Sequence, residues 1–223
     1  MTRSGTLEGF PVPCLYIVTD RAATGGRPLE AVVEAALAGA ARAGLRPGDV
    51  ALQLRERDLG GRALRRLAGA LREVTRAAGA PLFVNDRVDV ALAVGAEGVH
   101  LGGTSLRPAD VAAVAPSLAI AVSAHAPDHL DGLAGLVSFA VFGPIRDTPS
   151  KRAYGPPVGL QALRAGAARG VPLLAIGGLT ADDVPEIRAA GARGLACIRA
   201  VMSAGDPAEA TATLGWALAA PPG

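Results

Sequence analysis

Two polar residues that occur once each in the chain, Asn85 and Lys151, follow short apolar runs. The 22 basic residues are otherwise all arginines, so the ammonium group at position 151 stands alone. A lysine ammonium is a compact, mobile point charge and does not replace a guanidinium freely where it meets a phosphate or a carboxylate. The alternative is that one lysine survives by chance in an arginine-rich sequence. We interpret the two residues as part of an anion-binding site.

A second group of candidate anion ligands alternates along the chain at Gln53, Arg55 and Arg57. Alternate residues of a strand share one face, so this spacing would present one amide and two guanidinium groups on the same side. Such a face suits an anionic group. An exposed ladder of charges, with Glu56 as the local partner of the arginines, explains the pattern equally well.

The glycine pair Gly177-Gly178 lies between an apolar run and Thr180, which has the character of a helix N-cap. Glycines at such a junction let the backbone approach a phosphate, and a helix start supplies N–H groups. Arg199, with Ala200 beside it, could add a bidentate contact from the next loop. A tight turn that requires positive φ is the alternative explanation of the pair.

One histidine is placed for proton transfer near neutral pH. His125 comes two residues after Ser123, at the end of an apolar run, whereas His100 lies inside a run and His129 lies among acidic residues. We therefore expect His100 in the core, His129 in solvent and His125 as a general acid–base. No His, Cys and carboxylate cluster has metal-ligand spacing, so no metal is expected from the spacing alone.

The elements that must position these groups alternate regularly. Short apolar runs are each followed by a segment of helical periodicity, which indicates a parallel sheet with right-handed crossovers. Eight such units predict a single (β/α)8 barrel over 14–223, preceded by an arm over 1–13. An open doubly wound sheet would want a GxGxxG motif after the first strand, and none is present. The expected strands are 14–19, 50–54, 81–84, 98–101, 119–123, 137–142, 172–176 and 194–198, and the expected helices are 28–43, 63–78, 88–94, 108–114, 127–136, 158–168, 180–190 and 207–218.

Composition excludes several classes of function. The net charge of +2 is small and the arginines are scattered, which argues against nucleic-acid binding. No apolar run approaches the ~20 residues that span a bilayer, and no secretory signal is apparent. Cys14 and Cys197 are far apart and form no CxxC pair, so we expect two reduced, buried cysteines in a cytoplasmic protein.

Several sequence blocks in fixed order resemble the thiamine phosphate synthase and TenI family of thiazole-handling barrels. They span nearly the whole chain: LYIVTD (15–20), LQLRER (52–57), VNDRVDVALAVGAEGVHLG (84–102), VSAH (122–125), FGPIRDTPSK (142–151) and AIGGLT (175–180). The resemblance to the synthase implies two subsites. The pyrophosphate of an aminopyrimidine substrate would be held by Gln53, Arg55, Arg57, Asn85 and Lys151, and Ser123 and Thr148 are further candidate substrate-binding residues. A thiazole phosphate would lie at Gly177, Gly178, Arg199 and Ala200.

One departure from the synthase pattern decides our expected activity. The family synthases usually carry a Gln-Glu-Asp-like triplet after His-Leu-Gly, whose Asp binds Mg²⁺ together with the residue matching Asp86; this chain has Gly103-Thr104-Ser105. A single carboxylate is a poor Mg²⁺ site. We therefore expect a TenI-like thiazole tautomerase without a cofactor, in which His125 transfers the proton that aromatises a carboxythiazole phosphate.

Two alternatives stay open beside the tautomerase. One is a thiamine-phosphate synthase that uses Mg²⁺ at Asp86, and the other is a non-catalytic regulator that binds a thiazole phosphate. The resemblance also implies a homodimer.

Overall fold

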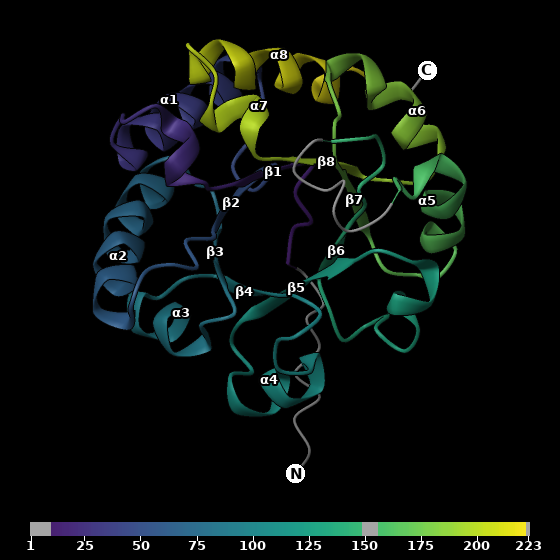
Figure 1. The fold of residues 1–223 in the computed structure, drawn as a ribbon, viewed down its shortest axis with the longest axis horizontal. Helices are drawn as coiled ribbons and strands as arrows, with labels where there is room; N and C mark the ends of the chain where they lie inside the picture. The colour runs from purple at the N-terminus through teal and green to yellow at the C-terminus, as the bar shows by residue number, and fades with distance from the viewer. Residues whose placement is uncertain (1–9, 149–155, 222–223) are drawn as a thin grey trace.

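Eight parallel strands close into a barrel in which each strand pairs with its neighbours in sequence and β8 pairs with β1 (Figure 1). The computed structural model describes residues 10–148 and 156–221. The predicted (β/α)8 barrel is therefore confirmed. The strands are β1 (Leu15–Val18), β2 (Val50–Leu54), β3 (Leu82–Asn85), β4 (Gly98–Leu101), β5 (Ala119–Ala124), β6 (Phe139–Phe142), β7 (Leu173–Ile176) and β8 (Gly194–Cys197).

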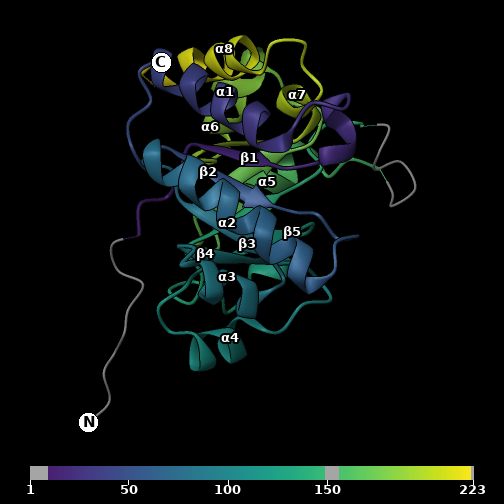
Figure 2. The same cartoon turned by 90° about the vertical axis from the view of Figure 1, so that its left-hand side faces the viewer.

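Helices surround the barrel, and α1 packs against α8, the last helix of the chain (Figures 1 and 2). Within the described part of the chain, no helix is both long and apolar enough to cross a membrane. The helices are α1 (Leu29–Arg42), α2 (Gly61–Ala77), α3 (Val88–Val94), α4 (Pro108–Val114), α5 (Gly159–Ala167), α6 (Val184–Ala189), α7 (Arg199–Met202) and α8 (Pro207–Ala219), with 3-10 turns η1 (Arg21–Thr24), η2 (Pro127–Leu130) and η4 (Ala181–Asp183).

The core has two layers because both faces of every strand are covered. One layer lies between the sheet and the helices, and the other fills the barrel interior. In the interior, the rings of Tyr16, Phe83 and Phe139 pack edge to face with centroids 5.1–5.7 Å apart. All three rings come from the first half of their strands, so they form an aromatic floor beneath the carboxyl ends of the strands.

One predicted helix is wrong in extent, and one short helix was not predicted. The expected helix 127–136 is only the turn η2, because Gly132 and Gly135 adopt φ of 73° and 74°, a left-handed conformation that ends the helix. The loop after β8 instead contains the short helix α7, which the sequence pattern did not indicate.

Candidate active site

Polar side chains near the carboxyl ends of β2 and β3 form a chain of hydrogen bonds at the opening of the barrel. Gln53, which is 3% exposed, donates from Nε2 to Oδ1 of Asn85 over 3.0 Å. Asn85 in turn donates from Nδ2 to Oδ2 of Asp86 over 2.7 Å. Since the carboxyl ends of all parallel barrel strands meet at one end, we call this end the mouth. The chain of hydrogen bonds fixes three polar side chains along one side of it.

Asp86 has an unusual backbone conformation. Its φ of 61° makes it the one non-glycine residue with positive φ within residues 10–148 and 156–221. Such conformations cost energy and cluster at functional sites. The Ser105 hydroxyl donates to Oδ1 of Asp86 and accepts the Gly102 N–H over 2.6 Å. The serine that replaces the expected carboxylate therefore still contacts Asp86.

Positive charge gathers beside this carboxylate. Arg55 is partly buried, and burial lowers the pKa of its guanidinium; the nearby charge of Arg57 lowers it further, while Asp20, Asp86 and Glu56 act in the opposite direction. Two guanidinium groups close enough to repel each other create a field that favours an anion. The predicted grouping of Arg55 and Arg57 with Asn85 is thus present in the fold.

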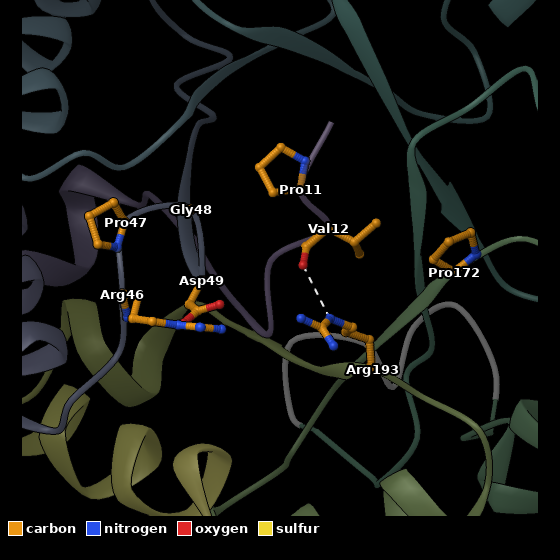
Figure 3. Close-up of a pocket in the computed structure, with 8 residues that line it drawn as sticks. All are labelled: Pro11, Val12, Arg46, Pro47, Gly48, Asp49, Pro172 and Arg193. Carbon is orange, nitrogen blue, oxygen red and sulfur yellow. Dashed lines mark hydrogen bonds and ion pairs between the residues drawn. The ribbon is translucent and has the colours of Figure 1, made fainter. Parts of the chain in front are cut away.

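A cavity of about 400 Å³ opens next to this group, between the loops that follow β2, β3 and β4. Its lining combines apolar and charged side chains: Leu54, Glu56, Arg57, Leu59, Leu64, Asn85, Asp86, Arg87 and Thr104. A larger cavity of about 580 Å³ lies at the other end of the barrel, among residues that precede strands (Figure 3). There Arg193 donates to the Val12 carbonyl and Arg46 pairs with Asp49. None of the predicted site residues lines that second cavity.

A buried hydrogen-bond chain leads from the aromatic floor to Ser123. The Tyr16 hydroxyl lies 3.3 Å from Nδ1 of His100, and Nε2 of His100 lies 2.9 Å from Oγ of Ser123. His100 is 2% exposed, and burial lowers its pKa to about 3, so the ring is neutral. Burial also keeps Tyr16 protonated by raising its pKa well above the usual value. If Tyr16 donates to Nδ1, then Nε2–H donates to Ser123, and every group in the chain is satisfied. The core placement predicted for His100 is confirmed.

His125 lies exposed at the mouth, between the ends of β5 and β6. Its Nδ1–H donates to the Gly143 carbonyl over 2.5 Å, because a carbonyl oxygen can only accept. Its backbone N–H donates to Nδ1 of the exposed His129 over 3.3 Å. The geometry therefore leaves Nε2 of His125 facing away from the Gly143 contact.

The glycine pair after β7 is required by close packing. Gly177 and Gly178 have φ of 106° and 65°. A Cβ at Gly177 would meet Cβ of Pro144 at 2.5 Å, and one at Gly178 would meet Cβ of Arg146 at 2.9 Å. The Arg146 N–H donates to the Gly177 carbonyl over 3.0 Å. The turn interpretation of the pair therefore holds whether or not a phosphate binds there.

The side chain of Arg146 ties the same loop to α6. It donates to Asp183 over 3.0 Å and to Glu186. Asp183 also accepts the Thr180 N–H over 2.8 Å, which completes the predicted cap after the glycine pair. The loops after β6 and β7 are thus joined as one unit at the mouth.

The remaining predicted residues lie at the edge of the described site. Arg199 and Ala200 are exposed at the start of α7, directly after β8. Thr148 is the last residue described before the gap at 149–155, so Lys151 lies outside the described residues. The lone ammonium therefore stays a prediction.

Sequence reasoning missed the role of Glu56. The side chain is 5% exposed and contacts Thr19 and Arg21, whereas the sequence suggested an exposed partner for the neighbouring arginines. The alternation that aims Arg55 and Arg57 at the mouth should turn Glu56 toward the covered face of the sheet. This alternation is the sequence signal from which the burial of Glu56 could have been predicted.

Comparisons with known proteins identify the family of this chain. A family model described as thiamine monophosphate synthase matches residues 15–201. The thiamine-phosphate synthase of Roseiflexus castenholzii is 42% identical over 204 residues, covering 90% of this chain and 86% of the relative. That of Moorella thermoacetica is 42% identical over 208 residues, covering 90% and 93%. The solved thiamine phosphate pyrophosphorylase of Pyrococcus furiosus superposes with a TM-score of 0.80 at 31% identity, covering 94% of this chain and 96% of that one.

These relatives overturn the expected tautomerase, and with it the proton-transfer role assigned to His125. The expectation depended on one position, Ser105, which leaves Asp86 without a carboxylate partner. In the structure the Ser105 hydroxyl donates to Asp86, and the synthase relatives show that this one position was given too much weight. The match over residues 15–201, together with relatives of similar length, shows that the chain belongs to the thiamine monophosphate synthase family.

Proposed function

We propose that this protein is a thiamine-phosphate synthase, which joins hydroxymethylpyrimidine pyrophosphate to thiazole phosphate. In this reaction the thiazole nitrogen forms a bond to the pyrimidine methylene carbon, the carbon–oxygen bond breaks, and diphosphate leaves. The observation that carries the proposal is the pairing of Arg55 and Arg57 with the Gln53–Asn85–Asp86 chain at one side of the mouth. Strand β7, with the glycine pair after it, lies across the barrel from β2 and β3 (Figure 1).

The guanidinium groups suit the diphosphate end of the first substrate. Negative charge develops on the departing diphosphate as the carbon–oxygen bond breaks. Prepositioned cations stabilise such charge more strongly in a partly buried site than in water. Arg55 and Arg57 would supply these cations, Asn85 would donate an amide hydrogen, and Lys151 is predicted to reach the same group.

Gln53 and Ser123 suit an aminopyrimidine ring. With the tautomer in which Tyr16 donates to Nδ1, His100 donates to the Ser123 oxygen, and the serine hydrogen is then available to a ring nitrogen. Because Gln53 donates from Nε2 to Asn85, its oxygen is turned to accept from an exocyclic amino group. A donor and an acceptor above the aromatic floor would orient the ring so that its methylene carbon faces the mouth.

The second substrate would bind across the mouth. Gly177 and Gly178 supply backbone that a phosphate can approach, and Arg199 and Ala200 lie directly after the neighbouring strand β8. A phosphate held there would direct the thiazole nitrogen toward the pyrimidine methylene carbon.

The family activity implies Mg²⁺, and the residues present fit it only together with substrate. No group of three His, Cys, Asp or Glu side chains within the described residues could hold a metal alone. However, Mg²⁺ is commonly bound by one or two carboxylates, waters and substrate phosphates. Asp86, with the Ser105 hydroxyl beside it, provides such a partial site. When bound, the ion would neutralise charge on the diphosphate.

The proposal is tested by incubating purified protein with both substrates and Mg²⁺ and measuring thiamine phosphate and released diphosphate. We expect both products in equal amounts, and Arg55→Ala should reduce kcat/KM by roughly a hundredfold. Arg164→Ala, which removes an exposed guanidinium on α5, is the matched control. Absence of thiamine phosphate above background would refute the proposed function. The homodimer stays a prediction, which sedimentation of the pure protein tests.

A further inference from the structure

A buried carboxylate lies between Arg55 and Arg57 in the sequence; it borders the cavity at the mouth and contacts the segment after β1. Glu56 is 7% exposed and belongs to the loop that follows β2. Its Oε1 accepts a hydrogen bond from the Thr19 hydroxyl over 2.7 Å and another from the Arg21 N–H over 3.1 Å. Its Oε2 lies 3.5 Å from Nε of Arg21. All these contacts come from the segment after β1, so Glu56 joins the first and second loops of the barrel.

Thr19 carries this contact to the backbone of Arg55. Thr19 is fully buried, and its single hydroxyl hydrogen is used on Glu56. The oxygen of the same hydroxyl accepts the Arg55 N–H over 2.9 Å. The Thr19 N–H donates to the Gln53 carbonyl over 2.9 Å. Glu56 therefore fixes the direction of the hydroxyl that fixes the backbone of Arg55.

This anchor opposes a repulsion within the loop. Arg55 and Arg57 are two residues apart, and the charge of Arg57 contributes to the lowered pKa of Arg55. Without a bound anion, the two guanidinium groups favour conformations that separate them. A loop that had to be reordered on binding would lose affinity for its ligand.

Stability alone does not explain the carboxylate. Burial raises the pKa of Glu56, and the hydrogen bonds from Thr19 and Arg21 offset this only in part. The charged form is therefore less favourable here than in water. A buried group that costs stability while it orders a charged loop has the character of a functional requirement.

We propose that Glu56 is a positioning residue that acts through Thr19 to preorganise Arg55 for the diphosphate group. This inference rests on the proposed function for its choice of ligand. Although Glu56 borders the cavity, the role assigned to it is exerted through Thr19 and needs no contact with substrate. Replacement of Glu56 should therefore weaken diphosphate binding selectively and leave the opposite, thiazole phosphate side of the mouth unchanged.

The test compares Glu56→Ala and Glu56→Gln with Glu209→Ala, which removes a carboxylate from the exposed ion pair with Arg42. Calorimetric titration with inorganic diphosphate measures binding without catalysis, and steady-state kinetics give KM for each substrate. We expect Glu56→Ala to raise the Kd for diphosphate and the KM of the pyrimidine substrate by about tenfold. The KM of thiazole phosphate should stay within about twofold. Glu56→Gln keeps an oxygen acceptor for Thr19 and should restore most of the binding.

A second pair of variants guards against a folding defect in Glu56→Ala. Thr19→Val removes the hydroxyl with little change of shape and should weaken diphosphate binding, while Thr19→Ser should preserve it. Hydrogen exchange at the Arg55 amide should accelerate in Thr19→Val and Glu56→Ala. Equal increases of both KM values, or unchanged diphosphate binding in these two variants, would overturn the inference.

The outcomes separate this inference from the proposed function. If the wild-type protein forms no thiamine phosphate but binds diphosphate in a Glu56-dependent way, the positioning role stands and the proposed reaction fails. If the protein is active and diphosphate binding ignores Glu56, only the positioning role fails. If the wild-type protein does not bind diphosphate, both fail.

Discussion

Mild acid should destabilise this protein through a single buried imidazole. His100 is 2% exposed, and burial lowers its pKa from 6.5 to about 3; the charge of Asp86 acts in the opposite direction, and the charges of Arg55 and Arg57 lower the pKa further. A base whose pKa is lower in the folded state favours the neutral form there. Its contribution to stability is therefore full above pH 6.5 and is lost as the pH falls toward about 3.

The size of the effect follows from the two pKa values. One pH unit between the folded and unfolded pKa corresponds to about 1.4 kcal/mol. At pH 4, an unfolded His100 is almost fully protonated, while the folded one is mostly neutral. The free energy of unfolding should therefore fall by roughly 3 kcal/mol between pH 7 and pH 4 through this residue alone.

Chemical denaturation at both pH values measures this loss. Carboxylates also titrate in this range, so the wild-type protein must be compared with His100→Gln, which offers an acceptor and a donor to Tyr16 and Ser123 but does not titrate. We expect the wild-type protein to lose roughly 3 kcal/mol more than the variant. Equal losses in the two proteins would show that His100 is not held neutral by burial, and the assigned hydrogen-bond directions would then be wrong.

Three further predictions concern other parts of the fold. Gly177→Ala should lower Tm and raise the KM of thiazole phosphate, because its Cβ would lie 2.5 Å from that of Pro144. Gly132 has a φ of 73° and open space around it, so Gly132→Ala is the control that isolates backbone strain in the same thermal and kinetic assays. Asp206→Ala removes the N-cap of α8 and should lower the free energy of unfolding by about 1 kcal/mol in denaturation, with both KM values unchanged. Burial raises the pKa of Cys197 to about 12, so a thiol reagent at pH 8 should modify it only after unfolding, as timed absorbance readings would show.

The order of strands and helices along the chain could be predicted because the buried strands of a parallel barrel are continuous apolar runs. The helix over 127–136 failed for a local reason: Gly132 and Gly135 interrupt a pattern that is otherwise helical. Helix α7 has four residues and buries only Val201 and Met202, which leaves too short a period to recognise.

For the site, strand adjacency was enough to bring Gln53 and Asn85 together, because both lie near the carboxyl ends of the neighbouring strands β2 and β3. Contacts between loops were not predictable in the same way. The hydroxyl of Ser105 reaches Asp86 across a turn, and the sequence pattern alone counted that position as a lost carboxylate. The error about activity came from giving one residue type more weight than the likeness of the rest of the chain to synthases.

The aromatic floor has a consequence for the order in which the two substrates of the proposed reaction would bind. With Tyr16, Phe83 and Phe139 packed across the barrel, the mouth is a cup with one opening rather than a passage. Under the proposed function, the pyrimidine would rest at the bottom of the cup, against Gln53 and Ser123, while the thiazole phosphate would sit at the rim. The pyrimidine substrate must then bind before the thiazole phosphate. A thiazole phosphate that binds first would block access of the pyrimidine to its site.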